Sequence, residues 1–202
     1  MKKIFSLLAL ALLVVLFCFY FFPKQPKNIF DEIYHETEKT YRSNNILRNI
    51  DGFKIRPDWS SDDPNISYTP FGKYETLPKG YSDITINFNF GEGIKGVSIR
   101  FERKTNSNIT LWYSAHYNLQ KKVLKKKLAI FEEPRKPGQF IDDEEKVREY
   151  LRKNNISKEE LEKDYDEIIN QKVLKDWCSI YDSKYSPSNY GDVKIETQWE
   201  NW

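Results

Sequence analysis

The chain has 202 residues, of which 15% are aromatic, and it carries 32 basic and 30 acidic side chains. This near-neutral balance argues against a general nucleic-acid binder, which normally has a net basic surface. The two cysteines, Cys18 and Cys178, lie in an apolar run and in the distal part of the chain, so they are not expected to pair within one molecule. An exported domain without an internal disulfide suits a Gram-positive bacterial surface better than a eukaryotic extracellular one.

The first segment of the chain predicts a membrane anchor. Two lysines precede 19 uncharged residues, Ile4 to Phe22, which span about 28 Å as a helix, close to the thickness of a bilayer's hydrocarbon core. A cleaved signal peptide has a shorter apolar core that ends in small residues, whereas this run ends in bulky ones. A lipoprotein acylated at Cys18 needs a small residue before the cysteine, where Phe17 stands. Both remain alternatives to a single-pass anchor over residues 1–22.

The charges around this segment predict its orientation. Lys2 and Lys3 favour a cytoplasmic N-terminus, so the rest of the chain is expected to face outward. Residues 23–27 (PKQPK) predict a short linker, because proline does not continue the anchor helix. Residues 28–202 have the length and polarity of one extracytoplasmic domain.

The segment that follows the linker predicts a helix over residues 28–42. Asn28 can cap its start, Asp31 and Glu32 suit its first turn, and apolar residues recur at helical spacing. Residues 51–81 are rich in Gly, Pro, Asp and Ser, which predicts loops with one or two short strands.

Alternating apolar residues in the middle of the chain predict a β-meander. The alternation runs through residues 84–90, 97–102 and 109–117, which polar turns separate, and a weaker pattern continues over 121–131. Period-two alternation with short turns is typical of an antiparallel sheet with one apolar and one solvated face. We expect about four to six strands in this sheet.

Two helical patterns follow the sheet. Asp142 or Asp143 caps a short helix, and the sequence from Ser157 to Glu160 is a capping box that opens a long amphipathic helix. Residues 192–200 alternate again and predict a last strand. The predicted fold class is therefore α+β, an antiparallel β-meander with helices packed on one face, preceded by a single N-terminal transmembrane helix.

The search for catalytic and metal-binding motifs gives no candidate site. The two histidines, His35 and His116, lack metal-binding spacing, and Cys178 lies near an apolar helical stripe, where a buried inert thiol is expected. Acidic residues within 58–63 could ligate calcium, but the EF-hand spacing is absent and a turn-forming loop is the simpler interpretation. We therefore predict no catalytic residue, cofactor or metal, while a hydrolase with a dispersed acidic pair stays open.

Charge is segregated along the chain. Residues 95–127 contain nine Lys or Arg side chains and one acid, whereas residues 132–167 contain 13 acids and eight bases. A basic solvated sheet face backed by acidic helices would steer an acidic partner or anionic lipid headgroups. The alternative explanation is that lysines on exposed strands discourage aggregation.

Alternation also places a group of polar and aromatic residues on the solvated face. If Leu111 and Tyr113 point to the core, Trp112 points outward beside Ser114 and His116. A large exposed aromatic among basic residues has the composition of an interaction hot spot, unless a bulge or an overlying loop buries it. We predict a partner-binding face made of seven residues: Asn87, Arg100, Trp112, Ser114, His116, Lys125 and Lys127.

The plan of the chain matches that of a known family. It combines the N-terminal anchor, the Pro-containing spacer, the segment NIFDEIYHE at 28–36 and the segment WCSIYDSKYSPSNYGDV at 177–193. This combination resembles the TipC family of streptococcal immunity proteins. The resemblance implies a protein outside the membrane of a cell that makes a TelC-like toxin, which the type VII pathway exports and which attacks lipid II. It implies that the protein binds and blocks this toxin without a reaction of its own.

The functional prediction is therefore a membrane-anchored immunity protein, not an enzyme, whose partners are a secreted toxin and the cell membrane. No nucleic acid, small-molecule substrate or cofactor is expected. Two other classes remain: an anchored module that binds an envelope polymer or lipid through the basic face, and the extracytoplasmic hydrolase. An immunity protein should protect a sensitive cell from one toxin, whereas a binding module should adsorb to cell walls or anionic vesicles in a salt-sensitive manner.

Overall fold

The computed structural model describes most of the predicted outer domain. It covers residues 25–40, 53–55, 72–74, 77–89, 95–105, 109–132 and 140–199. The predicted anchor, residues 23–24 of the linker and the acidic residues of 58–63 lie outside these ranges. No helix within the described ranges has the length and apolar character needed to cross a membrane.

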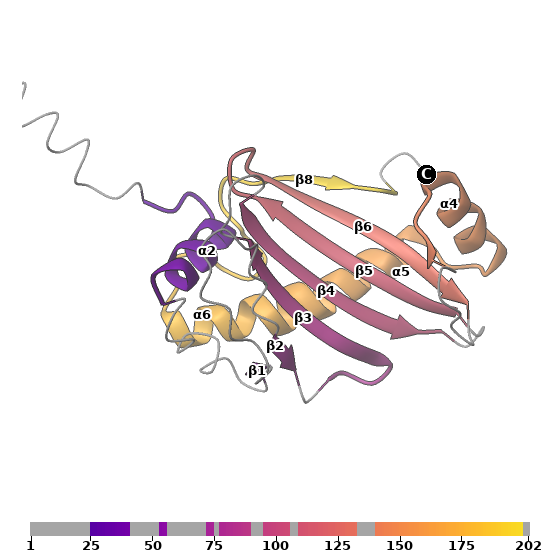
Figure 1. Cartoon of the computed structure of the whole chain (residues 1–202), viewed down its shortest axis with the longest axis horizontal. Coiled ribbons are helices and arrows are strands. Elements are labelled where there is room, and N and C mark those ends of the chain that lie inside the picture. Colours follow the sequence, from indigo (N-terminus) through magenta and orange to yellow (C-terminus); the bar gives the residue numbers. More distant parts are fainter. Residues whose placement is uncertain are drawn as a thin grey trace, which may run out of the picture.

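The centre of the domain is the predicted antiparallel meander (Figure 1). Its four long strands are β3 (Tyr81–Asn89), β4 (Gly96–Lys104), β5 (Ile109–Asn118) and β6 (Val123–Glu132). Each strand pairs antiparallel with the next along the chain, as the alternation and the short turns predicted. The multistranded α+β fold is confirmed.

Four short strands bring the described sheet to eight, more than the four to six expected. They are β1 (Phe53–Ile55), β2 (Gly72–Tyr74), β7 (Phe140–Ile141) and β8 (Lys194–Thr197). The first two extend the meander beyond β3, where the sequence predicted loops with one or two short strands. The two-residue β7 was missed, because so short a segment shows no alternation.

The last strand departs from the meander. β8 lies where residues 192–200 predicted a strand, but it pairs with β6 in parallel, with Leu124 opposite Ile195. Beyond β8, the Gln198 side chain continues the pairing: its Oε1 accepts a hydrogen bond from the Leu128 backbone N–H at 2.7 Å. Between β8 and β7, a backbone N–H of β6 is thus hydrogen-bonded to a side chain and not to a neighbouring strand.

Five helical segments complete the described structure. They are α2 (Ile29–Thr40), α4 (Glu144–Lys153), α5 (Lys158–Tyr165), η1 (Asp166–Leu174) and α6 (Lys175–Tyr181). Asn28 caps α2 as predicted, because its Oδ1 accepts from the Asp31 backbone N–H at 2.9 Å. Asp143 and Ser157 cap α4 and α5 through the same kind of bond. The Glu160 carboxylate of the predicted capping box pairs with Arg103 of β4.

The predicted long helix has a π-helical centre. The nine residues of η1 join α5 to α6, where a continuous α-helix was expected. Two buried apolar pairs, Ile168–Ile169 and Val173–Leu174, are five residues apart. This spacing matches the i to i+5 bonding of a π-helix, which turns both pairs toward the sheet.

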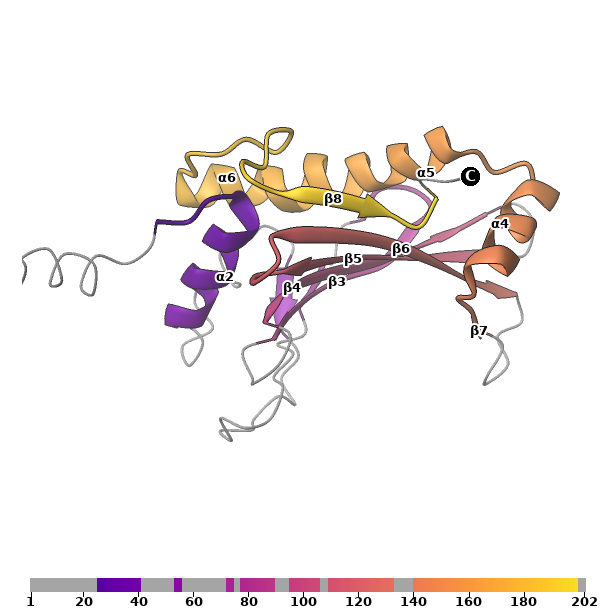
Figure 2. The same ribbon diagram turned by 90° about the horizontal axis from the view of Figure 1, so that it is seen from above.

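The helices α5, η1 and α6 cover one face of the sheet, as Figure 2 shows. Tyr165 of α5 lies edge-on to Phe101 and Tyr113, whose own rings stack with their centroids 4.5 Å apart. The Tyr165 hydroxyl donates to the backbone carbonyls of Ser114 and Lys127, at 3.0 and 2.8 Å. Aromatic packing and these hydrogen bonds therefore fix the helix on the core face.

The residues before α2 are bound to the loop before β8. The Asp192 backbone N–H donates to the Lys27 carbonyl at 3.0 Å, and the Ile29 N–H donates to the Tyr190 carbonyl at 2.9 Å. The Asn28 side chain is fully buried and donates to both the Asp192 carbonyl and the Tyr117 hydroxyl at 2.8 Å. Residues from both ends of the domain thus form one bonded layer.

Gly191 is needed where these two segments meet. Its φ is +87°, and a Cβ there would lie 2.6 Å from the Lys27 carbonyl oxygen. Gly191→Ala should therefore lower the free energy of unfolding by about 2–3 kcal/mol, since a left-handed backbone and a clash add. Gly80→Ala is the matched control: its φ is +94° but its Cβ would meet nothing within 4 Å. Urea denaturation should show the larger loss for Gly191→Ala, and equal losses would contradict the close approach.

Candidate binding face of the sheet

The face of the meander opposite the long helix carries the predicted binding residues. We call this surface the open face and define it by Ser98, Arg100, Trp112, Ser114, His116, Lys125 and Lys127, together with position 87. Figure 2 shows that, among the described elements, α5, η1 and α6 all lie on the other side. The alternation of buried and less buried residues along β5 assigns the two faces, with Leu111, Tyr113, Ala115 and Tyr117 toward the helices.

Strand register aligns these residues in rows across the sheet. In one row, Asn87 lies opposite Ser98, Ser98 opposite His116, and His116 opposite Lys125. In the next row, Arg100 lies opposite Ser114, which in turn lies opposite Lys127. All seven predicted positions therefore occupy one face, including the two lysines from the weakly periodic strand. Their role in binding stays a prediction.

Trp112 is oriented away from the helices but is only half exposed. The Arg100 guanidinium lies over its ring, 5.4 Å from the centroid, and the Phe140 ring packs edge-on at 5.5 Å. Phe140 itself is 39% exposed and also contacts Phe131, at 4.9 Å between ring centroids. Sequence reasoning missed this aromatic neighbour, because β7 was not predicted. The cluster of Trp112, Phe131 and Phe140 gives the open face an apolar patch that extends to the edge strand β7 and lies beside the Arg100 cation.

The cations of the open face are solvent-accessible. Arg100, Lys125 and Lys127 are exposed, and Lys125 forms an exposed ion pair with Glu196 of β8 at 3.3 Å. Such a pair contributes little to stability, so Lys125 stays available to a partner. Beside Lys125 and Lys127, a pocket of about 230 Å³ opens between β6, β8 and the start of α4. The same face also carries Glu102, which is buried and lies opposite Trp112, so the described part of the face combines exposed cations with a buried acid.

Three other bases of the same region, which were counted toward the basic solvated face from the sequence, point away from that face. Each is paired with a carboxylate: Arg103 with Glu160 and Asp164, Lys122 with Asp31, and Lys126 with Glu162. The acid-rich helices therefore neutralise part of the strand charge directly. Part of the charge segregation serves the packing of the helix layer on the sheet.

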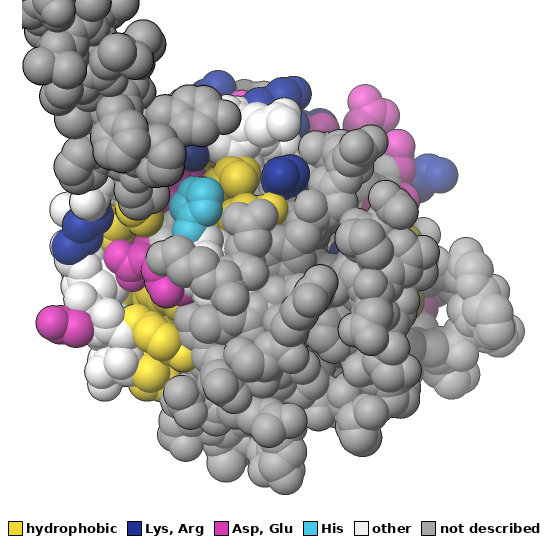
Figure 3. All heavy atoms as spheres, turned by 60° about the vertical axis from the view of Figure 1, so that its left-hand side comes forward, with side chains coloured by type: hydrophobic (Ala, Val, Ile, Leu, Met, Phe, Trp, Pro, Cys, Tyr) yellow, Lys and Arg dark blue, Asp and Glu magenta, His cyan; other side chains and the backbone are white. Residues whose placement is uncertain are grey.

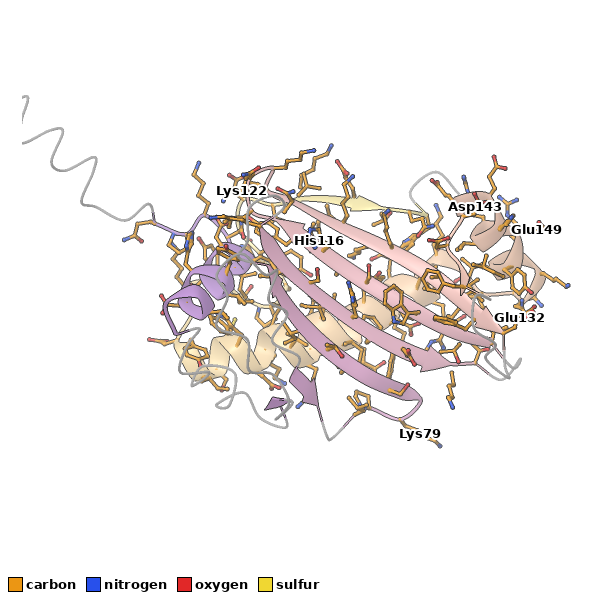
Figure 4. The ribbon with its side chains drawn as sticks, viewed as in Figure 1. Lys79, His116, Lys122, Glu132, Asp143 and Glu149 are labelled. Atoms are coloured by element: carbon orange, nitrogen blue, oxygen red, sulfur yellow. The ribbon has the colours of Figure 1, made fainter. Side chains whose placement is uncertain are left out.

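His116 is the titratable group at the centre of the open face (Figure 4). Its Nδ1 lies 2.6 Å from the Ser98 Oγ, and its position is between Ser98 on β4 and Lys125 on β6. Burial lowers the pKa of the imidazole below its ordinary value, and the nearby positive charge of Arg100 lowers it further. This environment favours the neutral imidazole.

An NMR pH titration should place the midpoint of His116 below 6.5, the ordinary value. Because the unfolded chain takes up this proton first, the contribution of His116 to stability is present above that value and decreases as the pH falls. Arg100→Gln should raise the midpoint, whereas Lys163→Gln on exposed α5 should leave it unchanged. His35→Asn assigns the two histidine signals. A midpoint at or above 6.5 in the unmodified chain would contradict the observed environment.

The described residues contain no group of three or more His, Cys, Asp or Glu side chains arranged to hold a metal ion. Cys178 is half-buried on α6, and its Sγ donates to the Tyr185 carbonyl at 3.5 Å. Burial raises the pKa of this thiol, which disfavours the reactive thiolate. The open face combines an apolar patch with exposed cations, which is suited to binding a macromolecule.

Comparisons with known proteins agree with this fold. The chain has the fold of TipC2 from Streptococcus intermedius B196: the TM-score is 0.79 at 42% sequence identity, over 88% of this chain and 99% of that one. No curated protein matches the chain. The model of the family described as TipC immunity protein-like matches residues 1–198. The chain therefore belongs to the TipC family of immunity proteins.

Proposed function

We propose that this protein is a membrane-anchored, outward-facing immunity protein that neutralises a TelC-like toxin exported by the type VII pathway and acting on lipid II. It binds the toxin through the open face. Membership of an immunity-protein family implies a toxin partner. The anchor, the target and the Gram-positive setting are the proposed refinements of that role.

The observation that carries the proposal is the composition of the open face. It combines Trp112 and its aromatic neighbours with the exposed cations Arg100, Lys125 and Lys127 on a rigid four-stranded support. Interface hot spots are enriched in Trp and Arg, and exposed cations speed the association with an acidic partner. A partner with an acidic rim and an apolar knob would be complementary to this surface.

Binding alone is sufficient for such a role. A protein that covers the active site of a toxin, or the surface by which the toxin reaches its lipid substrate, blocks the reaction without chemistry of its own. Complementarity over about 800 Å² on each partner would give a stable complex. The rows of side chains on β4, β5 and β6 lie on one face of paired strands, so several of them can contact one partner at the same time.

The anchor is supported by the sequence and by the extent of the family match. The family model begins at residue 1, so the apolar run from Ile4 to Phe22 belongs to the matched region. An uncleaved anchor keeps the immunity protein on the cell that makes it, where an incoming toxin would act on a membrane-bound precursor. A cleaved protein would diffuse away and protect the producing cell less.

The direct test is protection together with complex formation. Expression of the chain in a sensitive bacterium should restore growth in the presence of its cognate TelC-like toxin, and the two purified proteins should elute together in size-exclusion chromatography. A non-cognate toxin of the same class is the control. The loss of both protection and complex formation, with a folded and surface-exposed chain, would refute the proposal. Salt-sensitive adsorption to cell walls or anionic vesicles without toxin binding would favour the envelope-binding module instead.

A further inference from the structure

Hydrogen bonds hold Pro26 and Lys27 against the rest of the domain, and this limits how the domain is placed on the membrane. The Pro26 carbonyl accepts hydrogen bonds from the Tyr185 hydroxyl at 2.6 Å and from the Lys184 ammonium at 3.0 Å. Lys27 follows, with its carbonyl bonded to the Asp192 N–H and its own N–H donating to the Asp31 carboxylate at 3.1 Å. The chain is therefore held by the domain from Pro26 onward.

The same layer is joined to the turn between β5 and β6. The Lys122 ammonium lies 2.7 Å from both Asp31 carboxylate oxygens, and Asp31 also accepts from the Tyr117 hydroxyl. Lys122 adopts a left-handed backbone, with a φ of +56°. Figure 4 shows Lys122 beside α2 at one end of the molecule, whereas Asp143 and Glu149 lie at the other end on α4. Residues 26–31, the loop 184–192 and this turn thus form one end of the domain, which we call the proximal end.

The distance from the apolar run to this end is short. Four Cα steps separate Phe22, its last residue, from Pro26. A fully extended chain covers at most about 14 Å over those steps. The headgroup layer outside the hydrocarbon core is itself about 5–7 Å thick. If the run is the anchor, Pro26 therefore lies at most about 9 Å beyond the outer edge of the headgroup layer, which keeps the proximal end next to the bilayer.

We propose that the proximal end of the domain rests on the phospholipid headgroups, so that the strands of the meander run away from the membrane. This inference depends on the proposed anchor. The bonded layer matters as well, because a flexible segment between Pro26 and α2 would let the domain turn freely relative to the membrane. With the layer intact, the open face is close to the bilayer and roughly perpendicular to the membrane plane.

The charges of the proximal end are compatible with a headgroup contact. Lys27, Lys121 and Lys184 are exposed there, together with the acids Asp182 and Asp192. Figure 3 views the molecule from this side and shows basic and acidic side chains interspersed among those described. The short tether, and not a basic patch, therefore holds the proximal end at the membrane. The consequence for function is that a toxin acting on a lipid-linked precursor would meet the open face close to the membrane.

Fluorescence quenching in vesicles tests this placement with the full chain. In a Cys18→Ser, Cys178→Ser background, a fluorophore is attached to Ser188→Cys or Gln120→Cys at the proximal end, or to Glu149→Cys on α4 as the matched distal control. All three native residues are exposed. The vesicles contain phosphatidylglycerol and a lipid with a nitroxide on its headgroup. We expect several-fold stronger quenching at positions 188 and 120 than at 149.

An insertion separates the tether from other causes of quenching. About ten Gly and Ser residues placed between Lys24 and Gln25 add a mean reach of roughly 18 Å. This variant should still float with the vesicles, and its quenching at position 188 should fall toward the distal value. Equal quenching at positions 188 and 149 in a chain that floats would overturn the inference and leave the anchor intact. A chain that fails to float with vesicles would overturn the anchor and the inference together.

Discussion

Trp112→Ala combined with charge reversal at Arg100 and Lys125 should weaken toxin binding by at least about 100-fold. Truncation of a central Trp hot spot alone costs 2 kcal/mol or more, roughly 30-fold in Kd. Reversal of Arg100 also removes the cation over the Trp112 ring, 5.4 Å from its centroid, and repels an acidic partner. Titration calorimetry with the purified toxin measures the affinity, and the protection assay should show the same order of loss.

The control for this variant is a charge reversal on the helix side. Lys163→Glu and Lys175→Glu change two exposed lysines of α5 and α6, which pack on the opposite face. They should leave the affinity within about twofold, since rim and remote charges act weakly. Reversal of Arg100 and Lys125 should leave the melting temperature unchanged because both are exposed, whereas Trp112→Ala also removes packing against Phe140, so the melting transition of each variant is measured to confirm that it is folded. Unchanged binding by the triple variant would place the interface elsewhere on the domain.

The open face could be predicted because its signal is local. Alternation with period two assigns each residue of a strand to a face, whatever the strand pairs with. Leu111 and Tyr113 were predicted to point inward and Trp112 outward, and the structure shows this arrangement. Short turns then fix which strands are neighbours, which aligns Arg100 with Ser114 and His116 with Lys125. The helix caps at Asn28 and Ser157 were equally local signals.

The rest of the fold depends on contacts between distant segments. The sequence around Ile195 predicts a strand, but nothing local specifies that it pairs in parallel with β6. Phe140 gave no periodic signal, although it completes the aromatic cluster around Trp112. The bond between the Lys27 carbonyl and the Asp192 N–H joins residues from opposite ends of the domain. Such pairings are decided by the packing of the whole chain, which a pattern within one segment does not describe.

Charge was the signal that misled most. A base-rich segment followed by an acid-rich segment predicted one basic surface. Arg103, Lys122 and Lys126 instead form ion pairs with carboxylates of the helices. Alternation alone would have separated Arg100 from Arg103, since their positions differ by an odd number. The two arginines therefore have different roles: Arg100 is available to a partner, and Arg103 compensates the buried acid Asp164.

Asp164 is the buried acid whose charge depends most on Arg103. Its carboxylate, 5% exposed, lies 2.7 Å from the Arg103 Nε and accepts hydrogen bonds from the hydroxyls of Tyr81 and Tyr113. Burial raises the pKa of Asp164 above its ordinary value, although these hydrogen bonds and Arg103 act in the opposite direction. The charged form is therefore costly in the folded state, and Arg103 is the cation that compensates it.

Arg103→Met should consequently lower the free energy of unfolding at neutral pH by about 3–5 kcal/mol, because it leaves a buried carboxylate without a counterion. Arg148→Met, which breaks an exposed pair with Glu144, is the control and should cost less than about 0.5 kcal/mol. Without Arg103, the pKa of Asp164 should rise further.

The substitution Asp164→Asn and the pH dependence of stability then identify the cause of the stability loss in Arg103→Met. With the higher pKa, the folded variant binds the proton of Asp164 more tightly than the unfolded chain does, so its deficit should shrink as the pH falls from about 7.5 toward 5. Adding Asp164→Asn to Arg103→Met removes the unpaired charge while keeping the shape, and should restore much of the lost stability. Urea denaturation of the single and double variants at both pH values measures these effects. A deficit that is independent of pH and persists in the double variant would show that Arg103 acts through packing instead of through the charge of Asp164.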